Sequence, residues 1–135
     1  MQPIVHIIKI FDKLEVLIGK ELIAATHAII QLNPQIILLD IEKVTFADSG
    51  GLGAVVRAFK ISQVAGIRFV IFTSQNQVLN LFNLTSINQI LEIYKTKEEF
   101  YQQLKKEIPE YTYLTEIPEI PFIISLPLND SSKLK

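Results

Sequence analysis

An unbroken run of aliphatic residues at positions 36–39, Ile-Ile-Leu-Leu, constrains the fold of this chain more than any other feature. A strand with one face in water alternates apolar and polar residues, whereas an unbroken run indicates a strand that is covered on both faces. A second run at positions 67–72, interrupted only by Arg68, has the same pattern. Between the two runs, apolar residues recur at helical steps of three and four. The sequence therefore predicts an α/β fold.

Further strands and helices are expected on both sides of these runs. Residues 4–10 and 14–18 are predicted as two strands around a turn at 11–13, and residues 89–94 as a last strand. Helices are predicted at residues 21–32, 49–65, 78–84 and 96–107. Gly66 fits the C-terminal end of the second helix, and Thr96 with Glu99 forms a capping box at the start of the last. The expected architecture is a mixed sheet of four or five strands, beginning with a hairpin, and about four helices.

The chain of 135 residues fits one domain, predicted for residues 1–107, followed by a C-terminal extension at residues 108–135. Prolines and an acidic bias set the extension apart, and the prolines prevent any long regular element there. It is nevertheless too apolar for a solvated tail, since it contains Ile117, Ile120, Phe122, Ile123, Ile124 and Leu126. We expect the extension to pack on its own domain. The alternatives are a docking segment for a partner, a contact in a homodimer, or a disordered end.

The composition leaves few groups for chemistry. Cysteine is absent, which excludes disulfides, thiolate metal sites and a cysteine nucleophile. The two histidines, His6 and His27, have no suitable neighbours in the sequence and are expected to be structural. A formal net charge of -1 argues against a nucleic-acid binder. Apolar runs are far shorter than the roughly 20 residues of a membrane-spanning helix, and no secretory signal is evident. We therefore expect a cytoplasmic protein without a metal ion, a cofactor or a membrane partner.

The segment between the first buried strand and the second helix, residues 40–53, carries the groups most suited to function. It follows the carboxyl end of a strand, where ligands and functional loops gather in α/β sheets. Asp48 or Ser49 is expected to cap the helix. The glycines at positions 50, 51 and 53 each cost about 1 kcal/mol relative to alanine in a helix. Their presence predicts that another group approaches the backbone closely.

The first turn of that helix is also a predicted anion site. Free N–H groups of Gly50, Gly51 and Leu52, together with the helix dipole, favour negative charge there. A phosphate on Ser49 would add about 1.5–2 negative charges beside Asp48. The glycine spacing matches neither a phosphate-binding loop nor a dinucleotide fingerprint, and it does not form a nucleophile elbow.

The run Asp-Ser-Gly-Gly-Leu-Gly at positions 48–53, within residues 37–60, resembles the signature of the STAS domain. That family includes the bacterial anti-sigma factor antagonists, and the resemblance extends over residues 4–106. It implies that Ser49 is phosphorylated by a partner anti-sigma factor, which is a serine kinase. Unphosphorylated antagonist would bind the kinase and free the sigma factor, and a metal-dependent serine phosphatase would restore the free serine.

The resemblance implies a binding module and not an enzyme. Its expected docking surface comprises Asp48, Ser49, Gly50, Gly51, Leu52 and Arg57, with Lys60 on the same helix as a further candidate.

Two other functions are compatible with the residues alone. A small-ligand or nucleotide-binding α/β domain would use the same helix N-terminus for a phosphate. A small phosphatase or phosphotransferase would hold a divalent cation between Asp40, Glu42 and Asp48.

Overall fold

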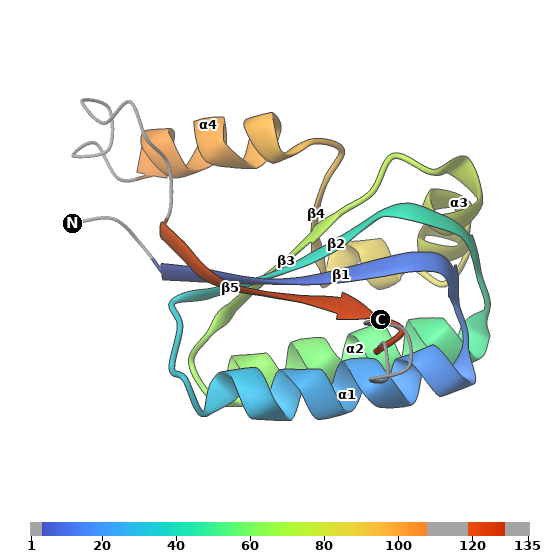
Figure 1. Cartoon of the computed structure of the whole chain (residues 1–135). Helices are drawn as coiled ribbons and strands as arrows, with labels where there is room; N and C mark the ends of the chain where they lie inside the picture. Colours follow the sequence, from blue (N-terminus) through green and yellow to red (C-terminus); the bar gives the residue numbers. More distant parts are fainter. Residues whose placement is uncertain (1–3, 108–118, 129–135) are drawn as a thin grey trace, which may run out of the picture.

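The structure, a computed structural model, describes residues 4–107 and 119–128 (Figure 1). Its strands are β1 (Ile4–Leu14), β2 (Ile36–Ala47), β3 (Arg68–Phe72), β4 (Glu92–Tyr94) and β5 (Glu119–Leu126). Its helices are α1 (Val16–Ile30), α2 (Ser49–Val64), α3 (Asn76–Leu84) and α4 (Lys97–Glu107), with a 3-10 turn, η1, at Ile87–Gln89. The five strands form one sheet in the order β4-β3-β2-β1-β5. The predicted α/β class, the four or five strands and the roughly four helices are confirmed, although the fifth strand is β5 and not the strand predicted at residues 14–18.

The sheet is parallel and not mixed, because every pairing among the described strands is parallel. The predicted hairpin is wrong. Residues 11–13 continue β1, and the positive φ of Asp12, 68°, belongs to a local register shift and not to a chain reversal. The chain then turns directly into α1, whose N-cap is Glu15. Its carboxylate accepts hydrogen bonds from the backbone N–H groups of Leu17 at 3.2 Å and Ile18 at 3.0 Å.

Helices cover both faces of the sheet, with α1 and α2 side by side below it and α4 above it in Figure 1. The described residues form two hydrophobic cores, and residues 36–39 belong alternately to one and the other, as the unbroken apolar run predicts. Ile37 and Leu39 belong to the core shared with α1, α2 and α3. Ile36 and Leu38 belong to the second core under α4, where Phe100, Tyr101 and Leu104 are buried.

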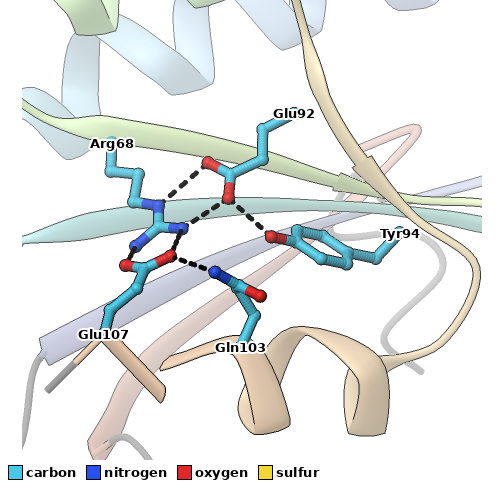
Figure 2. A network of polar contacts seen from close by, with 5 residues as sticks. All are labelled: Arg68, Glu92, Tyr94, Gln103 and Glu107. Carbon is cyan, nitrogen blue, oxygen red and sulfur yellow. Dashed lines mark hydrogen bonds and ion pairs between the residues drawn. The ribbon is translucent and has the colours of Figure 1, made fainter. Parts of the chain in front are cut away.

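Arg68, the one polar interruption in the second apolar run, joins β3 to β4 and α4 (Figure 2). Its Nε donates to Glu92 at 2.9 Å, and Nη1 and Nη2 donate to the two carboxylate oxygens of Glu107 at 2.8 and 3.1 Å. Nη2 also donates to Glu92. The guanidinium carbon lies 5.3 Å from the centre of the Phe100 ring, within the range of a cation–π contact. Tyr94 donates to the same Glu92 carboxylate at 2.8 Å, and burial with that contact raises the pKa of Tyr94 to about 12.

We expect the bond between Glu107 and Arg68 to make folding sensitive to acid. The bond lowers the pKa of Glu107 below its ordinary value of 4.5, so its stabilisation is present above that value and is lost as pH falls through the lower folded pKa. Urea unfolding at about pH 7 and about pH 3 measures this loss. The variant Glu107→Gln should lose less stability than the wild type between the two conditions, whereas Glu98→Gln, an exposed change on the same helix, should behave like the wild type. An equal loss in wild type and Glu107→Gln would contradict the assignment.

The described part of the C-terminal extension contributes β5 to the sheet. β5 pairs with β1 in parallel, with Ile7 opposite Ile123 and Ile10 opposite Leu126. Beyond the strand, the backbone N–H of Leu128 donates to Glu21 of α1 at 2.7 Å. Residues 108–118 and 129–135 lie outside the described residues, so the boundary at 107/108 stays a prediction.

None of the helices described is long and apolar enough to cross a membrane.

Candidate functional site

Asp48 caps α2, at the point where β2 ends and the helix begins. Its backbone is extended, and its Oδ1 accepts a hydrogen bond from the N–H of Gly51 at 2.9 Å. The N–H of Leu52 donates to the Asp48 carbonyl at 2.9 Å, and the N–H of Asp48 donates to the carbonyl of Leu14 at 3.2 Å. The expectation of three free N–H donors at this helix end is therefore wrong for Gly51 and Leu52. A carboxylate of the protein itself already occupies the position that an anion would take.

Ser49 is the first residue of α2 and is exposed. Its hydroxyl has no hydrogen-bond partner among residues 4–107 and 119–128, because Asp48 takes the capping role. The side chain is therefore presented to solvent at the rim of the sheet.

The three glycines of the loop have different structural roles. A Cβ on Gly51 would lie 2.0 Å from the carbonyl oxygen of Leu14, and one on Gly50 would lie 2.4 Å from Cγ2 of Val16. These two glycines let α2 begin against the junction of β1 and α1, which is the close approach that the sequence predicts. A Cβ on Gly53 would meet nothing within 4 Å. The packing of the domain therefore explains Gly50 and Gly51 but not Gly53.

Gln77 of α3 forms two hydrogen bonds with the backbone of Ala47, the residue before the N-cap of α2. Its side-chain amide accepts from the N–H of Ala47 at 2.7 Å and donates to the carbonyl of Ala47 at 2.8 Å. The neighbouring Gln75 donates to the carbonyl of Glu42 at 3.1 Å. The sequence does not predict these hydrogen bonds, because their partners lie some 30 residues away in the chain and no local pattern indicates them.

An exposed apolar pair lies next to the Ser49 loop. Val16, which touches Gly50, is 52% exposed, and Leu17 is 67% exposed. Both belong to the first turn of α1, and Phe46, two residues before the cap, is 47% exposed. Large apolar side chains that are left open beside a functional loop are typical of a docking surface. The sequence pattern predicts a strand at residues 14–18 and so gives no sign of this exposed pair.

The other predicted site residues divide between surface and core. Arg57 and Lys60 are exposed on α2, and the spacing of Ser49, Gly53 and Arg57 by four residues places them on one face of the helix. Leu52 is only 3% exposed and belongs to the core shared with α1. Gly51 is buried as well, so the accessible part of the predicted surface consists of Asp48, Ser49, Gly50, Arg57 and Lys60.

The three carboxylates of the proposed phosphatase site do not come together. Asp40 is buried on the α4 side, where it accepts from the N–H of Glu42 at 3.1 Å and pairs with Lys97 at 3.6 Å. β2 continues to Ala47, so Asp48 lies eight residue steps beyond Asp40, about 26 Å at about 3.3 Å each. Across residues 4–107 and 119–128, no three or more His, Cys, Asp and Glu side chains gather as metal ligands would. The alternative of a phosphatase in which these three carboxylates hold a cation is therefore wrong.

The two histidines lie where the sequence predicts. His6 is buried in β1, and burial lowers its pKa, whereas His27 is exposed on α1.

The family model of the STAS domain matches residues 5–100, which is most of the chain. The chain belongs to the STAS domain family. The match covers β1 to the start of α4 and includes the Ser49 loop, while β5 lies outside it. The resemblance of residues 48–53 to the STAS signature is thereby confirmed at the level of the family.

Solved structures with the STAS fold include both regulators and parts of transporters. A sulfate transporter family protein from Wolinella succinogenes is 16% identical, with a TM-score of 0.67 over 76% of this chain and 88% of that one. An anti-sigma factor antagonist from Mycobacterium paratuberculosis is 15% identical, with a TM-score of 0.60 over 70% and 80%. The anti-sigma factor antagonist SpoIIAA in its unphosphorylated form is 18% identical, with a TM-score of 0.60 over 73% and 87%. At these identities the likeness establishes the fold alone.

Proposed function

We propose that this STAS domain is a cytoplasmic, non-enzymatic phospho-switch that docks on a serine kinase of the anti-sigma factor type. The observation that carries the proposal is Ser49, an exposed hydroxyl without a hydrogen-bond partner in the described residues, beside the N-cap of α2. A residue that is modified by another protein has to be accessible and free of structural duties, and Ser49 meets both requirements. A structural neighbour of this chain, described as an anti-sigma factor antagonist in its unphosphorylated form, supports the choice of partner.

In the unphosphorylated state, the docking surface combines the Ser49 loop with apolar contacts. Val16 and Leu17 supply apolar area next to Gly50, and Arg57 supplies a positive charge two turns along α2. Gln77 and Asp48 hold the loop in one conformation through their hydrogen bonds to Ala47 and Gly51. A loop that is ordered before binding loses little entropy when the partner docks.

Phosphorylation of Ser49 would change this surface without unfolding the domain. The added charge lies at the positive end of the α2 dipole, which stabilises it within the chain. It also lies beside the carboxylate of Asp48, so the two groups form a concentrated negative patch. A like-charge contact with a kinase surface that accommodates Asp48 costs several kcal/mol, which lowers affinity by orders of magnitude.

A small-ligand or nucleotide site at the same helix end has less support. The N–H groups of Gly51 and Leu52 are already bonded, and the Asp48 carboxylate opposes a second anion.

Binding of Ser49 variants to the cognate kinase tests the proposal. We expect Ser49→Ala to bind like the wild type but to incorporate no phosphate, and Ser49→Asp to bind about tenfold more weakly, equivalent to about 1.4 kcal/mol. The phosphate itself, with its larger charge, should weaken binding further. Ser74→Asp adds the same charge at an exposed serine after β3 and should bind normally. Normal binding by Ser49→Asp, or phosphate found on a residue other than Ser49, would overturn the proposal.

A further inference from the structure

A groove of about 650 Å³ runs along the solvent side of α2, beside α1. The two helices lie side by side on the same face of the sheet (Figure 1). His27 lines the groove from α1, and the remaining lining residues come from α2. Three of these are apolar, namely Val56, Ile61 and Val64, and Val64 is 90% exposed.

Gly53 lines this groove, and the packing of the domain does not require it. A glycine within a helix costs about 1 kcal/mol relative to alanine. A side chain at position 53 would meet no atom within 4 Å and would project into the groove from α2. The free-energy cost of a glycine at position 53 is therefore explained if the groove has to stay open for another molecule.

The charges that line the groove have one sign. Arg57 and Lys60 line it, and no acidic residue does. Neither cation forms an ion pair with the described residues, in contrast to Arg68. The groove therefore complements a ligand that combines apolar groups with negative charge.

The groove has the dimensions of a helix-binding site. Its lining residues from Gly53 to Val64 span about 17 Å at 1.5 Å per residue, which equals about three helical turns. These residues recur at steps of three and four, so they lie along one face of α2. Residues with this spacing are the ones against which a second helix packs. All the lining residues belong to α1 and α2, so the groove offers no strand edge to an extended peptide.

We propose that this groove binds an acidic amphipathic helix of the partner protein. Apolar residues of that helix would contact Val56, Ile61 and Val64, and its acidic residues would pair with Arg57 and Lys60. Close contact of the helix with the backbone of α2 would occur at Gly53.

The proposal rests on the proposed function, because it extends the same docking surface and names the chemistry of the segment that recognises it. Ser49 lies one turn before Gly53 on the same face of α2, and about 12 Å of helix separates it from Arg57. A phosphate on Ser49 would thus lie at the end of the groove. It would lower the positive potential that attracts the acidic helix, by an amount that decreases with added salt.

The experiment is a selection of helical peptides displayed on phage against the whole unphosphorylated chain, followed by fluorescence anisotropy with the strongest peptide. We expect enriched peptides to carry acidic residues beside an apolar stripe. Gly53→Leu should weaken their binding at least about tenfold, the loss typical of removing one anchor contact, while the fold is retained. The double variant Arg57→Glu with Lys60→Glu should have a similar effect. Circular dichroism establishes that each variant is folded.

A matched control carries the same change in net charge at another surface. Lys95→Glu with Lys106→Glu alters exposed residues at and before α4, across the sheet from the groove, and should leave peptide binding unchanged. The proposal is overturned if no peptide is enriched, if the enriched peptides lack acidic residues, or if they bind Gly53→Leu as tightly as the wild type. Binding of vesicles that contain phosphatidylserine, dependent on Arg57 and Lys60 and without peptide enrichment, would assign the groove to a membrane surface instead. None of these measurements involves the phosphorylation of Ser49, so their failure leaves the kinase test untouched.

Discussion

A chain that carries Gly51→Ala is expected to be strongly destabilised. The new Cβ would lie 2.0 Å from the carbonyl oxygen of Leu14 and 2.4 Å from its carbonyl carbon. These are backbone atoms of β1, so no rotation of a side chain relieves the overlap. Either α2 moves away from the junction of β1 and α1, or the bond from the N–H of Asp48 to the Leu14 carbonyl breaks.

The expected loss is about 3 kcal/mol or more, because overpacking against a rigid backbone lies at the upper end of such effects. That is a large part of the roughly 5–15 kcal/mol that stabilises a typical domain. Urea unfolding followed by circular dichroism measures the difference. Gly53→Ala is the matched control: the same substitution, two residues further along α2 where the Cβ has open space, should stabilise the chain by about 1 kcal/mol. Similar shifts for the two variants would contradict the roles assigned to these glycines.

Arg68→Met is expected to cost about 3 kcal/mol and to loosen α4 from the sheet. The guanidinium side chain, 28% exposed, is the shared donor to Glu92 and Glu107 (Figure 2). Methionine keeps most of the apolar stem but leaves two carboxylates without their cation, of which Glu92 is half-buried and Glu107 is exposed. The loss at the half-buried carboxylate is larger than that of a surface ion pair. The contact with the Phe100 ring is lost as well.

Hydrogen exchange of α4 amides and urea unfolding report the effect of Arg68→Met. Arg57→Met removes an exposed arginine without ion pairs in the described part of the chain, and it should change stability by less than about 0.5 kcal/mol. Arg68→Lys should recover only part of the loss, since lysine cannot donate to two carboxylates in a planar fork. A stability loss for Arg68→Met no larger than that for Arg57→Met would show that the network of Figure 2 contributes little to folding.

Features determined by neighbours in the sequence could be predicted. The capping box of α4 is confirmed, because Glu99 donates its N–H to Thr96 at 3.2 Å and accepts from the N–H of Thr96 at 3.3 Å. Gly66 has a φ of 75°, as expected of a glycine after a helix. Asp48 caps α2, one of the two residues predicted for that role.

The start of α1 could not be predicted from local pattern. Glu15 is its N-cap, although Ser, Thr, Asp and Asn are the usual capping residues, so no signal separated the helix from the strand before it. The apolar residues from Leu14 to Ile18 are equally compatible with a strand. The exposed apolar pair of Val16 and Leu17, which the proposed docking surface includes, could therefore not be predicted.

The other features that could not be predicted depend on contacts between elements that are far apart in the sequence. Gln77 is hydrogen-bonded to Ala47, and Arg68 is hydrogen-bonded to Glu107. No local sequence pattern identifies the partner of either side chain. The glycines at 50, 51 and 53 look alike in the sequence and differ only in the neighbours that the fold supplies. The order of the parallel strands likewise depends on tertiary packing and cannot be derived from the periodicity of apolar residues.

The pairing of β5 with β1 has a consequence for how the protein is synthesised and how fragments of it are made. β1 leaves the ribosome first, and the strand that closes its outer edge begins only at Glu119. At about 5–20 residues per second, the edge of β1 stays open for roughly 10 s during translation, a period in which it can pair with another chain. A fragment cut at residue 100, where the family match ends, would keep this edge open permanently. Fragments for expression should therefore retain residues 119–126.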